Sequence, residues 1–253
     1  MEMSLVEKID SILVKKHGTK KLAAALESPI RLKMDHYSLG RRLLLVDPIP
    51  PKTKIAKYEI DGREVSVPKF TIASDITVNR KRWHKLVDLV SKDLEKKELR
   101  KILNLLAYVV KESQQVIKGA FSKKNFMSAL RLVEQNDLKV ASIVMNPKMY
   151  KRVLKMFSDM VDPCYHKEML NVGLIGWLWG MNILVNRNVS NKIYFCAEPE
   201  FAGALPLYRD PTCVACVERD GTLRIITEEE VGMGILNIKG VSVLDVREKR
   251  VKG

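Results

Sequence analysis

Histidine and cysteine are scarce in this chain of 253 residues, which has four of each. The histidines are scattered and never fall at the H-x-x-x-H or H-E-x-x-H spacing of a metal site. The cysteines are too few for the disulfide framework that stabilises small secreted domains. The sequence therefore favours neither a histidine-based metal centre nor a disulfide scaffold.

Two of the cysteines, Cys213 and Cys216, form a C-x-x-C pair in TCVACVERDGTLRIIT, which is typical of two strands joined by a turn at Asp220 and Gly221. Residues i and i+3 of a strand point to opposite faces, and a zinc ribbon would need a second pair. We therefore expect core or half-buried thiols. Cys164 lies close to His166, but no flanking pattern supports a nucleophile pair.

The motifs of common enzymes are missing as well. The chain has no G-x-S-x-G elbow, no phosphate-binding G-x-x-x-x-G-K-[ST] loop and no G-x-G-x-x-G after a strand. Gly232 and Gly234 indicate a tight strand bend instead. The run Glu228 to Glu230 lies on an extended segment, where side chains alternate, so we interpret it as a solvated run. Nothing in these patterns argues for an enzyme, and we expect a protein without enzymatic activity, catalytic residue, metal or cofactor.

Long apolar runs are also absent. The longest uncharged stretch contains Asn171 to Asn186, and its Asn and Gly residues interrupt the ~18–20 apolar residues that would be needed to cross a bilayer. The opening MEMSLVEKID holds three acidic residues and does not look like a secretory signal. We expect a soluble, intracellular protein with no membrane partner.

Positive charge, by contrast, is abundant: 44 Lys and Arg face 30 Asp and Glu, a net charge of +14. Such an excess favours a polyanionic partner, above all nucleic acid, although a merely soluble basic protein is the plain alternative. Aromatic residues make up only 6%, and they are not interleaved with the basic ones as in single-strand binders. Two basic groups stand out: Lys15, Lys16, Lys20 and Lys21, and then Arg80, Lys81, Arg82 and Lys85.

The middle of the chain predicts a hairpin followed by long helix. Alternating residues flank Asp61 and Gly62, a strong hairpin signal, and an extended run follows from Phe70 to Val78. A two-stranded ribbon is marginal in water, so this hairpin must lie on its own chain or on a neighbour. Residues 69–118 lack Gly and Pro, which favours long helix, and their apolar pattern shifts phase near Lys96, where we expect a bend or a break.

The second half alternates helix and strand signals. Ser122 is a candidate N-cap for a helix, and Asn146 with Pro147 opens another after the buried strand VASIVM. Four short patterns then follow in order: SIVMNPKMY, NVGLIGWLWGMNILVNRNV, KIYFCAEPEFAGALPLY and EEEVGMGILNIKGVSV. This order, from Ser142 to Val246, resembles the major capsid proteins of tailed double-stranded DNA viruses, which share the Johnson fold with encapsulin shells.

The resemblance implies an α+β fold with a particular layout. Residues 1–40 would form an N-terminal arm and residues 41–81 the β-hairpin called the E-loop. Residues 82–119 and 224–253 would form a peripheral domain with a spine helix, and residues 120–223 an inserted axial domain. Inter-subunit contacts would then involve the hairpin turn and two segments of the axial domain: Asp61, Gly62, Trp177, Trp179, Gly180, Pro199, Phe201 and Pro206.

The function that this resemblance implies is a shell subunit of a virion, assembled in the host cytoplasm from pentamers and hexamers. Its partners would be copies of itself, packaged double-stranded DNA without sequence specificity and, in some relatives, a scaffold, portal or decoration protein. The two basic groups would then face the DNA in the lumen. Two alternatives stay open: an encapsulin-like compartment that holds a protein cargo, and a monomeric basic nucleic-acid-binding protein.

Overall fold

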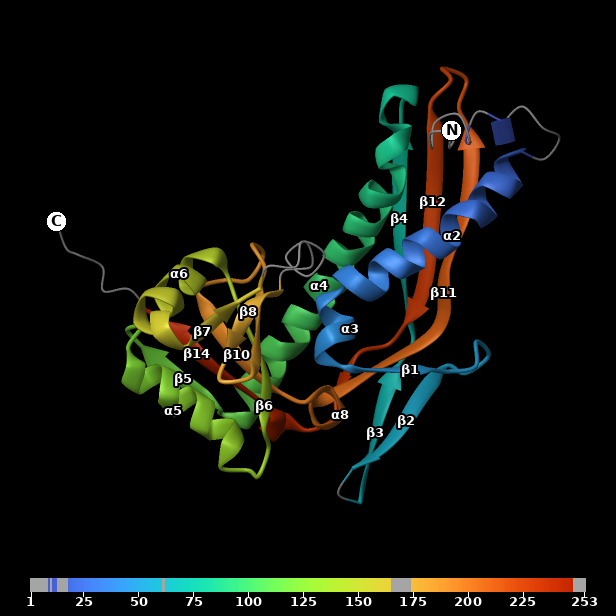
Figure 1. Cartoon of the computed structure of the whole chain (residues 1–253). Coiled ribbons are helices and arrows are strands. Elements are labelled where there is room, and N and C mark those ends of the chain that lie inside the picture. Colours follow the sequence, from blue (N-terminus) through green and yellow to red (C-terminus); the bar gives the residue numbers. More distant parts are fainter. Residues whose placement is uncertain (1–8, 10, 13–17, 61, 165–173, 248–253) are drawn as a thin grey trace.

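The computed structural model describes residues 9, 11–12, 18–60, 62–164 and 174–247. They form two sheet-based units and a projecting two-stranded hairpin (Figure 1). The first unit contains α2 (Gly18–Tyr37), α3 (Leu39–Leu43), β1 (Leu45–Pro48), β4 (Phe70–Val78), η1 (Arg80–Lys85), α4 (Leu86–Ser113), α8 (Pro199–Ala202), β11 (Gly203–Val217), β12 (Leu223–Val231) and β13 (Gly234–Ile235). Its five-stranded sheet has the order β1-β11-β12-β4, with β13 also paired to β11.

The second unit is built on a seven-stranded sheet of order β5-β14-β10-β6-β9-β8-β7. Its elements are β5 (Val116–Gly119), α5 (Lys123–Glu134), β6 (Val140–Met145), α6 (Pro147–Met156), η2 (Ser158–Met160), β7 (Val161–Pro163), β8 (Leu174–Leu178), β9 (Met181–Val185), β10 (Lys192–Ala197), η3 (Ile238–Gly240) and β14 (Val241–Val246). The hairpin consists of β2 (Ile55–Ile60) and β3 (Arg63–Pro68).

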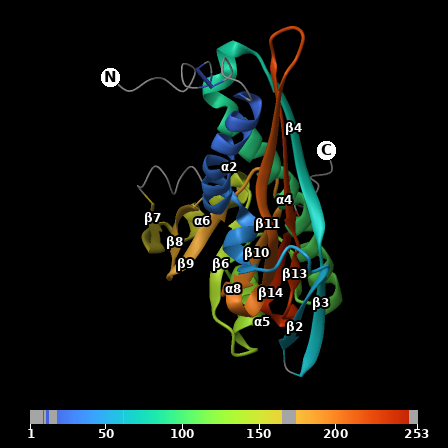
Figure 2. The same cartoon turned by 90° about the vertical axis from the view of Figure 1, so that its right-hand side faces the viewer.

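The two sheets are covered differently. Helices α2 and α4 pack on one face of the five-stranded sheet, α2 over β11 and α4 over β4 (Figure 2). Strand β12 alternates accordingly, with Leu223 and Ile225 buried under the helices and Arg224 on the other face. The seven-stranded sheet is buried on both faces, since α5 and α6 share one apolar cluster with it and α4 packs on the opposite face.

Helix α4 joins the two units, and the expected break near Lys96 is wrong. The helix is continuous from Leu86 to Ser113. Val90 and Leu94 are buried in the first half, while Ile102 and Leu106 are buried in the second. The apolar pattern slips because the helix changes partner, from α2 and β4 in its first half to β14 and η3. The phase shift of the apolar residues near Lys96 therefore reflects a change of packing partner along one continuous helix.

The expected arm over residues 1–40 also needs correction. Residues 18–37 form helix α2, whose Leu22, Leu26, Ile30 and Met34 are buried in the core at four-residue spacing. Pro29 lies inside this helix, and such a residue normally argues against helix because it removes a backbone donor. Burial of one apolar stripe outweighs that cost, so this segment belongs to the body of the molecule.

Strand pairing moves two further boundaries. The expected E-loop, 41–81, contains the hairpin, but β4 at its end pairs along its whole length with β12. The expected axial domain ended at residue 223, yet β11 (Gly203–Val217) pairs with β12 and belongs to the five-stranded sheet. Conversely β14, assigned to the peripheral part, lies between β5 and β10 in the seven-stranded sheet. Pairing between residues far apart in the sequence determines which sheet each strand joins, and local sequence patterns do not indicate such pairing.

The local signals are confirmed. Ser122 caps α5 by accepting a hydrogen bond from the Asn125 amide, and Asn146 caps α6 in the same way through Met149. Gly62 and Gly221 have positive φ in the two tight turns. Gly234 serves another purpose than the expected bend: a Cβ there would lie 2.4 Å from Val67, so glycine lets the hairpin pack closely.

Candidate functional site

The structure gathers most of the basic candidates at one end of the molecule. Lys20 and Lys21 are exposed in the first turns of α2, and Arg80, Lys81, Arg82 and Lys85 are exposed in η1. Both segments lie at the end of the five-stranded sheet where β11 turns into β12 (Figures 1 and 2). Lys15 and Lys16 lie outside the described residues. We call the six described residues the basic end.

Local structure explains why these side chains are exposed. Within η1 only Trp83 is buried, 5% exposed, and it packs into the core between β4 and α4. This anchor holds the short helix on the body of the molecule and turns its basic residues outward. Two helical segments that are far apart in the sequence, α2 and η1, thus bring positive charges to the same end of the molecule, where their electrostatic potentials add.

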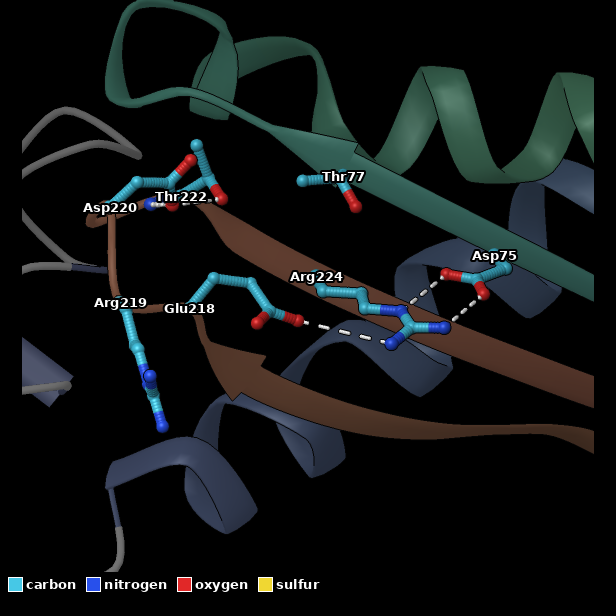
Figure 3. A pocket seen from close by; sticks show the side chains of 7 residues that line it. All are labelled: Asp75, Thr77, Glu218, Arg219, Asp220, Thr222 and Arg224. Atoms are coloured by element: carbon cyan, nitrogen blue, oxygen red, sulfur yellow. Dashed lines mark hydrogen bonds and ion pairs between the residues drawn. The ribbon is translucent and has the colours of Figure 1, made fainter.

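A cavity of about 670 Å³ lies at the same end, beside the β11–β12 turn (Figure 3). Its lining comes from β4, β12 and the turn: Asp75, Thr77, Glu218, Arg219, Asp220, Thr222 and Arg224. Arg224 donates from Nε and Nη2 to the two oxygens of Asp75, at 2.9 and 2.6 Å. These hydrogen bonds lower the pKa of Asp75 and raise the pKa of Arg224.

This cavity is not built to hold an anion. Its Arg224 guanidinium is already neutralised by Asp75, and the Glu218 carboxylate lies 3.9 Å away. The pKa of Asp220 is lowered by hydrogen bonds from Thr222, so this carboxylate also adds negative charge. The lining side chains therefore fasten β4, β12 and the turn together, and they leave the positive charge of this end to α2, η1 and Arg219.

The hairpin is held at its base by one buried tyrosine. Tyr208 on β11 is 2% exposed; its hydroxyl accepts from the Ala56 amide at 2.9 Å and donates to the Val67 carbonyl at 3.1 Å. Tyr58 in turn donates to Asp47 at 2.9 Å. Burial and this hydrogen bond raise the pKa of Tyr58. Beyond this base the hairpin projects away from both sheets (Figure 1).

The expected inter-subunit residues fall on three separate places. Gly62 lies at the exposed hairpin turn, and Asp61 beside it is outside the described residues. Trp179 and Gly180 form the β8–β9 turn, where Trp179 is 43% exposed and packs edge-on against Phe157. Trp177 is half-buried on β8.

The third place is α8, which contains Pro199 and Phe201; Phe201 is 50% exposed. Pro206 follows on β11 but is buried, and its Cγ lies 2.8 Å from the position that a Cβ on Gly232 would take. The expectation that Pro206 contacts a neighbouring subunit is therefore wrong for its side chain, which packs within the chain.

Sequence reasoning missed one exposed apolar surface. On the sheet face opposite α2 and α4, Val214 is 64% exposed beside Ile226 of β12. The alternation of TCVACVE could have indicated it, since Cys213 and Ala215 are buried and therefore place Val214 outward. The same alternation puts Cys216, which is half-buried, on the opposite face from buried Cys213, as expected.

The described residues contain no group of three His, Cys, Asp or Glu side chains placed to bind a metal ion. Cys164 is buried, and His166 lies outside the described residues. Across the same part of the chain, every helix is too short or too polar to pass through a bilayer.

No family model matches the sequence, and no curated protein resembles it at the sequence level. Solved structures do resemble the fold. A virus-like particle from Pyrococcus furiosus superposes with a TM-score of 0.60 at 17% identity, over 88% of this chain and 99% of the other. The capsid of a native GTA particle superposes with a TM-score of 0.56 at 13% identity, over 84% of this chain and 91% of the other. The capsid of the cyanophage P-SCSP1u superposes with a TM-score of 0.56 at 9% identity, over 84% of this chain and 89% of the other.

These matches cover both sheet units, because each spans more than four fifths of this chain. The chain therefore has the fold of tailed-phage capsid proteins and virus-like particles, and the predicted Johnson fold is confirmed.

Proposed function

We propose that this chain is a structural shell subunit, the major capsid protein of a tailed virus or of a related particle, and not an enzyme. The observation that carries the proposal is the fold itself, which matches a virus-like particle chain over 99% of that chain's length. Copies of the subunit would associate through pentamers and hexamers into a closed shell. Symmetry repeats each contact around the shell, so contacts that are individually weak suffice.

The projecting hairpin supports self-assembly. Its base is fixed by Tyr208, but Ile55 on β2 is 48% exposed, and β2 and β3 extend beyond the five-stranded sheet (Figure 1). An isolated two-stranded ribbon is marginal in water and gains stability when it lies on another surface. A neighbouring subunit would supply that surface, with Trp179 and Phe201 making further contacts.

The basic end would face packaged DNA. Six basic side chains at one end of each subunit, repeated around a shell, offset phosphate charge without reading sequence. Packaging of double-stranded DNA, and the use of a scaffold or portal, are expectations for this protein as a capsid subunit.

Electron microscopy of the purified protein tests assembly. We expect closed particles in negative stain and elution in the void volume on gel filtration. A species near 28.9 kDa under all salt conditions would contradict a self-assembling shell and favour a monomeric nucleic-acid-binding protein. Nuclease treatment followed by absorbance at 260 and 280 nm then separates cargoes: protected nucleic acid indicates a viral capsid, whereas co-purifying protein indicates an encapsulin-like compartment.

A charge-matched pair of variants tests the basic end. Replacing Lys20, Lys21, Lys81 and Lys85 by Gln should lower protected DNA and reduce the slope of log affinity against log salt by up to about 3–4, since each phosphate contact contributes about 0.9. The control replaces Lys123, Lys124, Lys151 and Lys155, exposed on α5 and α6, and removes the same charge. Equal losses in both variants would show that net charge alone matters and that the basic end has no special role.

A further inference from the structure

The interior of the subunit contains an unbalanced ionic cluster where four elements meet. Arg41 of α3 and the carboxyls of Glu98 on α4 and Glu229 on β12 are buried, with side chains 2%, 0% and 0% exposed. Asp35 of α2 completes the cluster and is 50% exposed. One guanidinium thus faces two fully buried carboxyl groups. The expectation that the run Glu228 to Glu230 is solvated is wrong for Glu229, because strand alternation turns it toward the helices.

The hydrogen bonds do not satisfy both buried carboxylates. Arg41 donates from Nη2 to Glu229 at 2.6 Å and from Nη1 to Asp35 at 2.7 Å. Its Nε lies 3.6 Å from Glu98 and makes no hydrogen bond. Among the described residues, neither oxygen of Glu98 and only one oxygen of Glu229 has a partner at good hydrogen-bond geometry, although Ser38 and Arg41 lie near enough to Glu98 to stabilise its ionised form in part. A buried, ionised carboxylate without donors is costly, and binding a proton removes that cost.

The surrounding groups act on the pair in both directions. They are Asp35 of α2, Arg41 and Ser38 of α3, Glu95 of α4 and Asp210 of β11. Arg41, the one cation among them, and Ser38 lower the pKa of Glu98, whereas the carboxylates favour the protonated form of the pair. Burial raises the pKa of both Glu98 and Glu229, and for Glu229 the proximity of Glu98 raises it further, to about 8.

We propose that Glu98 and Glu229 share one proton in the folded subunit, and that this proton locks the joint between α3, α4 and β12. Because the two groups lie together, the proton belongs to the pair. When it leaves, two buried carboxylates compete for one arginine, and α3 loosens from α4 and β12. Asp35 provides a route to solvent, since it lines an open surface cavity of about 470 Å³.

The position of the joint gives it a structural consequence. Glu98 lies in the middle of α4, where this helix passes from the five-stranded to the seven-stranded unit. Loosening at this point changes how firmly the two units are held relative to each other. The joint lies within one subunit, so its test is independent of whether the subunit forms a shell.

Folding stability as a function of pH tests the shared proton. A carboxyl whose pKa is raised in the folded state stabilises the protein fully below its unfolded pKa, and this stabilisation is lost as pH rises through the folded pKa. For the wild-type chain, the folding constant from urea titrations should fall by about tenfold per pH unit between about pH 5 and pH 8, relative to Glu229→Gln. Glu98→Gln is a second variant, and its folding constant should also lose this pH dependence.

Glu228→Gln is the matched control, because Glu228 is the sequence neighbour of Glu229 but is 49% exposed on the other face. It should keep the wild-type pH dependence. Parallel pH profiles for the wild type and both buried-site variants would overturn the proposal. If a variant does not fold, the wild type alone decides: infrared spectra near pH 6 should contain a protonated carboxyl band that disappears above about pH 8, and its absence at pH 6 overturns the proposal.

Hydrogen exchange tests the loosening itself. Protection factors, which correct for the intrinsic pH dependence of exchange, should fall selectively at amides of Ser38 to Leu44 and near Glu98 as pH rises. In Glu229→Gln they should stay constant over the same range. Constant protection in the wild type would overturn the proposed lock, even if the shared proton were confirmed.

Discussion

The two sheet units differ in how completely the chain buries its own surface. The seven-stranded sheet has apolar clusters on both faces, with α5 and α6 on one side and α4 on the other. The five-stranded sheet has its described helices on one face, and on the other it exposes Val214. The hairpin is less complete still, with Ile55 exposed. The chain thus stabilises itself mainly through the seven-stranded unit, and it leaves surfaces on the five-stranded sheet and the hairpin that a neighbouring copy can cover.

The largest expected loss of folding stability is in the seven-stranded unit, whose sheet is buried on both faces. Phe126 of α5 is 0% exposed and packs against Phe157 and Phe195 at ring distances of 5.1 and 5.0 Å. Phe126→Ala should lower the free energy of unfolding by about 3–5 kcal/mol, because it leaves a cavity in a closed core. Urea denaturation of the unassembled protein measures this loss.

Phe201→Ala is the matched control for that prediction, since Phe201 is 50% exposed on α8. It should change the free energy of unfolding by less than about 0.5 kcal/mol, while it reduces the fraction of protein in particles. If Phe201→Ala destabilised the subunit as strongly as Phe126→Ala, then α8 would contribute to the folded core and would not be a free surface for contacts between subunits.

An intermediate effect is expected at the base of the hairpin. Tyr208→Phe removes the hydroxyl that pairs with the Ala56 amide and the Val67 carbonyl, so two backbone groups lose their partner. We expect a cost of about 1–3 kcal/mol, concentrated in the hairpin. Hydrogen exchange should show faster exchange in β2 and β3, with both sheets unchanged. The control is Tyr108→Phe, at a side chain that is 62% exposed on α4; uniform loss of protection would show that Tyr208 supports the whole fold.

The smallest effect is expected for Arg224→Gln at the exposed Asp75 bridge. Both side chains are largely exposed, 42% and 50%, so solvent screens the pair and little stability depends on it. Because Arg224 lowers the pKa of Asp75, the small contribution is present near neutral pH and is lost on acidification. This sign is opposite to that expected for Glu229. Midpoints of thermal unfolding at low and high salt measure this contribution. A large loss of stability that does not depend on salt would contradict the expectation that the exposed pair contributes little.

The turns, caps and most strands were predictable because a few neighbouring residues determine them. Asp220 with Gly221 and Asn146 with Pro147 act through hydrogen bonds and φ preferences within one or two residues. The two clusters of basic residues were also identifiable from the sequence. The structure adds that α2 and η1 bring their described members to one end of the molecule (Figures 1 and 2). The full extent of helix α2 was not expected, because the resemblance assigned its residues to an arm and Pro29 lies inside the helix.

Local patterns predicted the separate elements and the excess of positive charge, and the resemblance of four short patterns to those of capsid proteins predicted the fold. Tertiary packing alone places β14 between β5 and β10, keeps α4 unbroken between two partners and buries Pro206. It also decided that Arg41, Glu98 and Glu229 meet in the core. The physical reason is shared: pairing and burial depend on residues far apart in the chain, and the environment that raises a pKa exists only after those residues have come together.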